Sequence, residues 1–133
     1  MPTVGMATGA GRGMGLACAE RLIDMVDHLV LVDRDEASVS QAAEGLSRSG
    51  GTTVEPFVLD ITDRDGLDRL ATRVSQRGSL RAVAHAAGIS PTMAEWGRIF
   101  EVDLVGTAQL AEALRPLAAS GTAMVCVASM APW

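Results

Sequence analysis

Residues 4–15 read VGMATGAGRGMG, an apolar run that passes directly into a turn containing four glycines. The run Val4–Ala7 has the character of a buried strand, and apolar residues then recur at helical spacing from Leu16 to Val26. Glycines between a strand and a helix allow a tight turn and a close approach of the backbone to a pyrophosphate. The stretch therefore predicts a strand–turn–helix unit that binds a dinucleotide.

The composition narrows the classes of site that this turn can form. The chain has 133 residues, and its eleven basic residues are all Arg, with no Lys, Asn or Tyr. A Walker phosphate loop is excluded because it requires a Lys. The length fits one domain, spanning residues 1–133.

Other features exclude several classes of partner. A net charge of −5 and 3% aromatic residues argue against nucleic-acid binding. No apolar run is long enough to cross a bilayer, and the uncharged N-terminus is not that of a signal peptide. Cys18 and Cys126 form neither a disulfide framework nor a zinc set, so we expect no metal and a reducing, cytoplasmic location.

Beyond the glycine turn, short apolar runs alternate with amphipathic stretches along the whole chain. The further strands are predicted at His28–Val32, Thr53–Leu59, Leu80–Ala84 and Ala123–Ala128. The further helices are predicted at Asp35–Ser47, from an N-cap at Thr62 to Gly78, and from about Met93 to Ala118, the last opened by a Thr92/Glu95 capping box. Five strands and four helices in strict alternation predict an α/β fold, a Rossmann-like doubly wound parallel sheet with helices on both faces.

Ligands of such sheets bind outside the carboxyl ends of the strands, so the residues that follow each strand carry the prediction of function. Asp33 follows the second strand, twenty residues after Gly13, which suits a carboxylate that binds a ribose diol. The alternative is an ordinary helix N-cap. A carboxylate there repels a 2′-phosphate by roughly 4 kcal/mol at 4 Å and an effective dielectric near 20, which favours NAD over NADP. Arg12 and Arg34 argue the other way, because either could reach a phosphate, so NADP stays possible.

Two further turns follow the third and fourth strands. Asp60-Ile61 places an acceptor beside an apolar side chain, which suits an adenine ring. The small residues Ala86-Ala87-Gly88 would let a cofactor lie along the sheet edge. Each could also be ordinary turn chemistry. His85, at the end of an apolar strand, is interpreted as a structural histidine whose hydrogen bonds are satisfied.

Together these motifs resemble the short-chain dehydrogenase/reductase family. Thr8-Gly9-x-x-x-Gly13-x-Gly15 resembles the glycine signature of that family, Asp33 the acidic residue of its NAD-preferring members, and Asp60-Ile61 its adenine-contacting pair. His85-Ala86-Ala87-Gly88 stands where the family has Asn-Asn-Ala-Gly. The resemblance implies hydride transfer between NAD(P) and a small alcohol or ketone. The cofactor-binding residues would be Gly9, Gly11, Arg12, Gly13, Met14, Gly15, Asp33, Arg34, Asp60, Ile61, Ala86, Ala87 and Gly88.

The catalytic residues follow from the same resemblance, which implies an Asn, a Ser, a Tyr and a Lys. Ser129 matches the substrate-orienting Ser, and Asp103 stands in the position of the Asn. An ionised Asp accepts hydrogen bonds but cannot donate them, so it is no simple replacement for an amide. The Tyr and Lys have no match. We therefore expect them beyond residue 133, in a longer single-domain enzyme whose sheet is incomplete here at its C-terminal end.

The predicted helix over residues 93–118 has apolar residues on several faces. That breadth predicts burial against the sheet and against a second subunit, giving a dimer or tetramer; a helix covered by a further part of the chain is the alternative. Two other functions remain open. A non-catalytic dinucleotide sensor would account for the missing Tyr and Lys. An S-adenosylmethionine-dependent methyltransferase would share the glycine turn and the acidic residue after the second strand.

Overall fold

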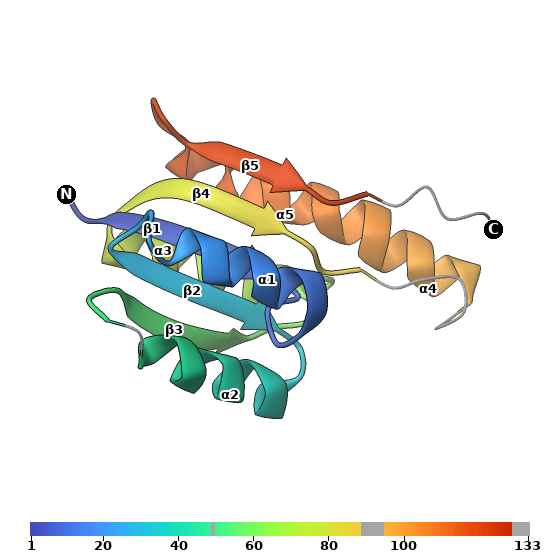
Figure 1. Cartoon of the computed structure of the whole chain (residues 1–133). Coiled ribbons are helices and arrows are strands. Elements are labelled where there is room, and N and C mark those ends of the chain that lie inside the picture. The colour runs from blue at the N-terminus through green and yellow to red at the C-terminus, as the bar shows by residue number, and fades with distance from the viewer. Residues whose placement is uncertain (49, 89–94, 129–133) are drawn as a thin grey trace.

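The computed structural model describes residues 1–48, 50–88 and 95–128. Its five strands form one parallel sheet, which confirms the predicted fold class, and their order is β3-β2-β1-β4-β5 (Figure 1). The strands are β1 (Thr3–Thr8), β2 (His28–Asp33), β3 (Thr53–Val58), β4 (Ser79–His85) and β5 (Ala123–Cys126). The strand order reverses between β1 and β4, and open α/β sheets bind ligands beside such a reversal.

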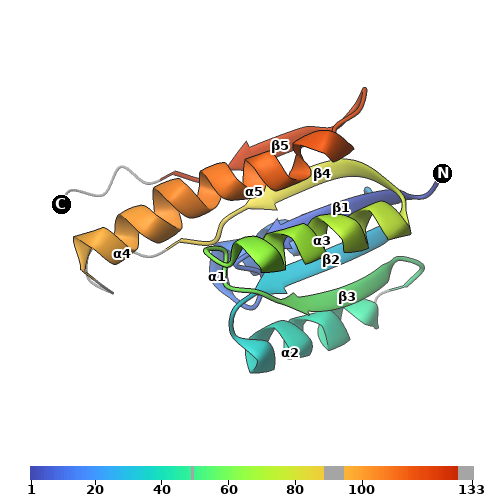
Figure 2. The same cartoon turned by 180° about the vertical axis from the view of Figure 1, so that it is seen from behind.

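Helices cover both faces of this sheet. Figures 1 and 2 show α1 (Gly13–Leu22) and α2 (Glu36–Ser47) on one face, and α3 (Arg64–Arg77) with a long helical run on the other. Successive residues of a strand point to opposite faces. In β2, accordingly, Leu29 and Leu31 pack with α1 and α2, whereas Val30 and Val32 pack with α3. Burial on both faces explains why the strands read as continuous apolar runs.

Two carboxylates cap the middle helices. The side chains of Asp35 and Asp63 occupy the N-caps of α2 and α3 and accept backbone hydrogen bonds there. The prediction that Thr62 caps the third helix is therefore wrong. The Thr62 hydroxyl instead donates to Oδ1 of Asp60 at 2.8 Å, which leaves the cap to the next residue. Gly78 ends α3 as predicted.

The last predicted helix is present as one helical run over residues 96–117, which we call the composite helix. It consists of α4 (Trp96–Phe100), a π-helical segment η1 (Glu101–Gly106), α5 (Thr107–Leu114) and a 3₁₀ turn η2 (Arg115–Leu117). It begins later than Met93, because Glu95 has an extended backbone with ψ 153°. Thr92, the expected start of a capping box, lies outside the described residues.

Other elements are also shorter than predicted, and β3 ends at Val58 rather than Leu59. α1 ends at Leu22 although its apolar pattern continues to Val26. Val26 is buried from the connecting turn, so its apolar character reflects core packing rather than helix. β5 ends at Cys126 rather than Ala128, yet the N–H of Val127 still donates to the carbonyl of His85 at 2.9 Å.

Candidate functional site

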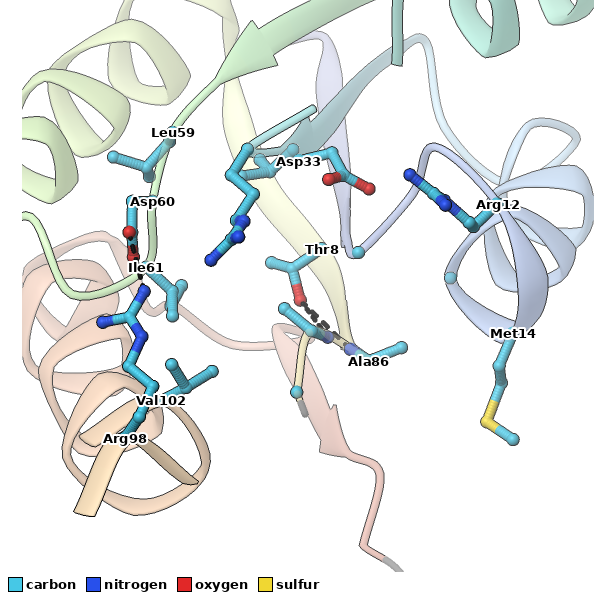
Figure 3. A pocket seen from close by; sticks show the side chains of 16 residues that line it. Thr8, Arg12, Met14, Asp33, Leu59, Asp60, Ile61, Ala86, Arg98 and Val102 are labelled. Carbon is cyan, nitrogen blue, oxygen red and sulfur yellow. Dashed lines mark hydrogen bonds and ion pairs between the residues drawn. The ribbon is translucent and has the colours of Figure 1, made fainter. Parts of the chain in front are cut away.

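A cavity of about 360 Å³ opens at the carboxyl ends of β1 to β4, where the fold predicts a ligand. Figure 3 shows its walls, which come from the glycine turn, the strand ends and the composite helix. Among the predicted cofactor residues, those that line it are Gly9, Arg12, Met14, Gly15, Asp33, Arg34, Asp60, Ile61, Ala86, Ala87 and Gly88. Gly11 and Gly13 belong to the same turn but do not line the cavity.

Two glycines of the turn are required by close backbone contacts. Gly9 has φ +63°, and a Cβ there would lie 3.0 Å from the backbone of Ala87. A Cβ on Gly15 would collide with the backbone carbonyls of Thr8 and Gly9. The first contact brings the glycine turn against the Ala86–Gly88 turn, and the second seats α1 on the end of β1. Larger residues would push these walls of the cavity apart.

The N-terminus of α1 differs from those of α2 and α3. Its N-cap residue, Arg12, makes no side-chain hydrogen bond to the first turn of the helix. Unsatisfied N–H groups at a helix N-terminus bind anions, assisted by the helix dipole. Arg12, Met14 and Gly15 from this region line the cavity, and the Met14 side chain is exposed. This end of the cavity therefore suits a phosphate group.

Asp33, the last residue of β2, fixes the glycine turn from the opposite side. Its Oδ2 accepts the Gly11 N–H at 2.9 Å, and its Oδ1 accepts the Asp35 N–H at 3.0 Å. The alternative interpretation of Asp33 as a helix cap is wrong, because Asp35 caps α2. Each carboxylate oxygen has a second lone pair, so both can still accept a hydroxyl from a ligand in the cavity.

The two arginines that could bind a phosphate have different surroundings. Nη2 of Arg12 lies 2.6 Å from Oδ2 of Asp35. Both side chains are well exposed, so solvent weakens the attraction. Arg34 is exposed and lines the cavity directly after Asp33. The cavity thus has positive and negative groups at the end of β2.

At the far end, Asp60 after β3 and Arg98 of α4 point toward one another (Figure 3), with Nη2 of Arg98 3.0 Å from Oδ2 of Asp60. Oδ1 of Asp60 accepts from both the N–H and the hydroxyl of Thr62. Burial opposes ionisation of Asp60, but the hydrogen bonds from Thr62 and Arg98 outweigh it and hold its pKa below the ordinary value. Ile61 supplies the apolar surface beside this pair.

The turns after β1 and β4 are joined by one hydroxyl. Oγ1 of Thr8 accepts the N–H groups of Ala86 at 3.0 Å and Ala87 at 3.1 Å (Figure 3). Thr8 is fully buried, so these hydrogen bonds are shielded from water. His85, beside Thr8, is also buried and has hydrogen bonds at both ring nitrogens, which agrees with its interpretation as a satisfied structural residue.

Of the two predicted catalytic residues, the structure describes Asp103. Asp103 lies in η1, outside the cavity lining, and a Cβ on Gly88 would be 3.0 Å from its Oδ1. Its side chain therefore lies beside the turn that follows β4. Ser129 lies outside the described residues.

Sequence reasoning missed several residues of the cavity wall. They are Val32, Leu59, Arg98 and Val102, together with Thr8, which the sequence predicts only as part of the glycine signature. Thr8, Val32 and Leu59 end or follow predicted strands, so the strand-end argument could have included them. Arg98 and Val102 have no local signal, because only the fold brings the composite helix to β3.

Comparison with known proteins identifies the family. A family model described as Enoyl-(Acyl carrier protein) reductase matches residues 9–132. The chain belongs to the short-chain dehydrogenase/reductase family. The chain is 34% identical over 110 residues to galactitol 2-dehydrogenase from Rhizobium johnstonii, covering 76% of this chain and 42% of that protein. It spans about half the length of the curated relatives that it matches.

Solved short-chain oxidoreductases share the fold. A metagenomic short-chain oxidoreductase in complex with NADP has a TM-score of 0.85 and 27% identity, covering 97% of this chain and 63% of that one. L-sorbose reductase from Gluconobacter frateurii, complexed with NADPH and L-sorbose, has a TM-score of 0.72 and 27% identity, covering 85% of this chain and 46% of that one.

The described part of the chain lacks two other kinds of feature. None of its helices combines the length and apolar character needed to cross a membrane. Within the same residues, no group of three or more His, Cys, Asp or Glu side chains is arranged to hold a metal ion.

Proposed function

We propose that the protein is an NAD-dependent oxidoreductase that transfers hydride between nicotinamide and a small alcohol or ketone. The observation that carries the proposal is the position of Asp33, which lines a cavity of about 360 Å³ and is hydrogen-bonded to the glycine turn. A carboxylate after the second strand and a glycine turn after the first are the groups that bind a ribose and a pyrophosphate in dinucleotide folds.

The residues present fit such a cofactor. The uncapped N-terminus of α1 and the close approach of Gly9 and Gly15 would accommodate the pyrophosphate. Asp33 would accept the ribose hydroxyls, and Asp60 with Ile61 would hold the adenine. Ala86–Gly88 would line the path along the sheet edge. The bound dinucleotide supplies the hydride chemistry, whereas the protein positions the groups and handles the proton.

NAD is the proposed cofactor, although solved relatives are described with NADP and NADPH. The carboxylate of Asp33 would lie close to a 2′-phosphate and repel it. Arg12, one of two cations that could offset this repulsion, is paired with Asp35. Arg34 keeps NADP binding possible.

We assign the remaining catalytic groups to residues outside the described part of the chain. Ser129 would orient the substrate oxygen, and the acid/base Tyr and its Lys would lie beyond residue 133. Residues 1–133 would then be the N-terminal cofactor half of a single-domain enzyme. Asp103, in the position of the family Asn, cannot donate a hydrogen bond when ionised, so we assign it a supporting role through water or a cation.

A homo-oligomer is proposed through the composite helix. Its outer surface exposes apolar side chains, with Trp96 72% and Leu104 60% exposed and Phe100 beside Trp96 in an edge-to-face contact. Exposed apolar patches of this kind mark interaction surfaces. A second copy of the chain is the proposed partner. The free thiols of Cys18 and Cys126 fit a cytoplasmic protein.

Titration calorimetry with NAD, NADP and S-adenosylmethionine tests the proposed cofactor. We expect binding of NAD, weaker binding of NADP and no binding of S-adenosylmethionine. Binding of S-adenosylmethionine alone would overturn the oxidoreductase assignment. Hydride transfer, followed by nicotinamide absorbance with a panel of alcohols and ketones, then separates an enzyme from a dinucleotide sensor.

A further inference from the structure

His85 occupies a junction between three walls of the cavity. It ends β4 and is paired in register with Thr8, the last residue of β1. Its Nδ1 lies 2.6 Å from Oγ1 of Thr8, and its Nε2 lies 2.8 Å from Oγ1 of Thr107 in α5. His85 is 2% exposed, and its hydrogen bond to Thr8 is buried, whereas its hydrogen bond to Thr107 is partly buried. One side chain thus connects the glycine turn, the turn after β4 and the composite helix.

The surrounding donors determine which ring nitrogen carries the proton. Oγ1 of Thr8 already accepts two N–H groups, from Ala86 and Ala87. A hydroxyl has two acceptor lone pairs and one hydrogen, so the Thr8 hydrogen is the group left to meet Nδ1 of His85. Nδ1 is therefore an acceptor without a proton. A proton on Nδ1 would leave two donors facing one another in a buried site.

The hydrogen bonds on the Nε2 side of the His85 ring agree with an unprotonated Nδ1. The neutral imidazole then carries its hydrogen on Nε2 and donates it to Oγ1 of Thr107. The Thr107 hydroxyl in turn donates to the backbone carbonyl of Asp103 at 2.8 Å. Every donor in the series has an acceptor, and the series ends in η1. Burial lowers the pKa of His85, and the Asp103 carboxylate opposes this lowering without outweighing it, so the ring stays neutral near pH 7.

We propose that His85, as the neutral tautomer protonated on Nε2, is a positioning residue that fixes the composite helix relative to the two turns of the dinucleotide site. This inference rests on the proposed function for the identity of the ligand. It does not require His85 to touch the cofactor, since His85 is not among the residues that line the cavity. A shape-matched side chain without hydrogen bonds would fill the same space but would not fix the helix.

Nitrogen-15 NMR of the histidine rings tests the tautomer directly. At pH 7 we expect one ring with an unprotonated Nδ1 and a protonated Nε2, and the His85→Asn variant identifies it as the ring whose signals disappear. An Nδ1–H tautomer or an imidazolium at His85 would overturn the proposal. This readout does not depend on whether a dinucleotide binds.

Two variants of Thr107 test the positioning role without altering His85. Thr107→Val keeps the shape and removes the hydroxyl, whereas Thr107→Ser keeps the hydroxyl. We expect about tenfold weaker NAD binding by calorimetry for the Val variant, and binding within about twofold of wild type for the Ser variant. NAD affinity unchanged in folded Thr107→Val protein would refute positioning, even if its melting temperature fell.

Failure of the proposed function and failure of the positioning role of His85 would give different results. If the wild-type protein binds no dinucleotide, the proposed function fails and the positioning role fails with it, while the NMR result still decides the direction of the hydrogen bonds. If the wild-type protein binds NAD but the Thr107 variants bind it equally well, the function stands and the role of His85 is structural only.

Discussion

The carboxylate of Asp33 accepts the backbone N–H of Gly11 at 2.9 Å, across 22 residues of sequence. This bond joins the end of β2 to the turn after β1, so the group proposed to bind the ribose also shapes the proposed pyrophosphate loop. Because Oδ1 of Asp33 accepts the Asp35 N–H as well, the carboxylate is fixed from two sides before any ligand arrives. A preorganised acceptor loses little freedom on binding.

The first prediction concerns this carboxylate. We expect Asp33→Ala to weaken NAD binding by about tenfold to a hundredfold, through loss of a charged hydrogen-bond acceptor. NADP binding should weaken less, because the 2′-phosphate of NADP is no longer repelled. The preference for NAD over NADP should therefore become smaller. Calorimetry measures both affinities. Asp63→Ala is the control, since it removes a carboxylate that also accepts a backbone N–H but lies outside the cavity. An unchanged NAD/NADP ratio in Asp33→Ala would refute the assigned role.

The second prediction compares two glycines. Gly15→Ala places a methyl group against the carbonyls of Thr8 and Gly9, so we expect a large loss of stability or failure to fold. Gly45→Ala, in α2, meets nothing within 4 Å and should raise the free energy of unfolding by about 0.5–1 kcal/mol. Thermal melting measures the change in stability of each variant relative to wild type. Equal effects would contradict the close approach of α1 to the end of β1.

The third prediction concerns an ionic cluster remote from the cavity. Glu55 of β3 accepts from His28 at 2.6 Å, Arg73 at 2.9 Å and Arg77 at 3.2 Å. Burial opposes its ionisation, but the hydrogen bonds from Arg73 and His28 prevail, so its pKa lies below the ordinary value for a Glu carboxyl in the folded protein. A lowered carboxyl pKa stabilises the fold above the unfolded-state pKa, and this stabilisation is lost as the pH falls through the folded-state pKa.

We therefore expect Glu55→Gln to lose about 1–3 kcal/mol of unfolding free energy at pH 7. The difference from wild type should shrink as the pH falls through the lowered folded-state pKa of Glu55, because the wild-type carboxyl then becomes protonated too. Urea denaturation at several pH values measures this. A difference that is the same at pH 7 and pH 3 would show that the charge of Glu55 contributes nothing.

The fourth prediction concerns the pair at the adenine end of the cavity. Arg98→Leu removes the contact with Asp60, but the two side chains are 32% and 40% exposed. Solvent screening then limits the loss of stability to below about 1 kcal/mol. We expect NAD affinity to fall by about threefold to tenfold, since the composite helix loses its anchor beside the site. Arg69→Leu, which loses a pair with Asp63 outside the cavity, should leave NAD affinity unchanged.

The fifth prediction tests the proposed subunit contact. Leu104→Arg places a charge on the exposed apolar face of the composite helix and should convert the oligomer to smaller species in light scattering. Met25→Arg is the matched control, because Met25 is 55% exposed but follows α1 on the opposite face of the sheet. A wild-type monomer, or an oligomer unaffected by Leu104→Arg, would exclude this interface.

The features predictable from sequence are those with a local cause. Strand positions follow from short apolar runs, and Asp33 and Asp60 could be placed at the cavity because they directly follow such runs. The sequence predicts the cap of α3 one residue too early, because Thr62 and Asp63 are both good N-cap residues. Only the contact between Thr62 and Asp60 decides between them.

Other features depend on contacts between distant segments. Arg98 meets Asp60 across 38 residues, and His85 meets Thr107 across 22. No periodicity or spacing encodes such pairs, because they depend on how the composite helix crosses the end of the sheet. The π-helical segment that carries Asp103 is equally hidden, since its sequence, EVDLVG, has no signal that separates it from an ordinary helix.

The position of β5 at one side of the sheet has a practical consequence for handling the protein. In the described residues it pairs on one side only, with β4. Val125 within β5 is 64% exposed, and Val127, just beyond its end, is 43% exposed. An apolar edge strand with free backbone groups is a template for pairing with other chains. We therefore expect residues 1–133 expressed alone to aggregate as concentration rises, and charged substitutions at Val125 to delay this.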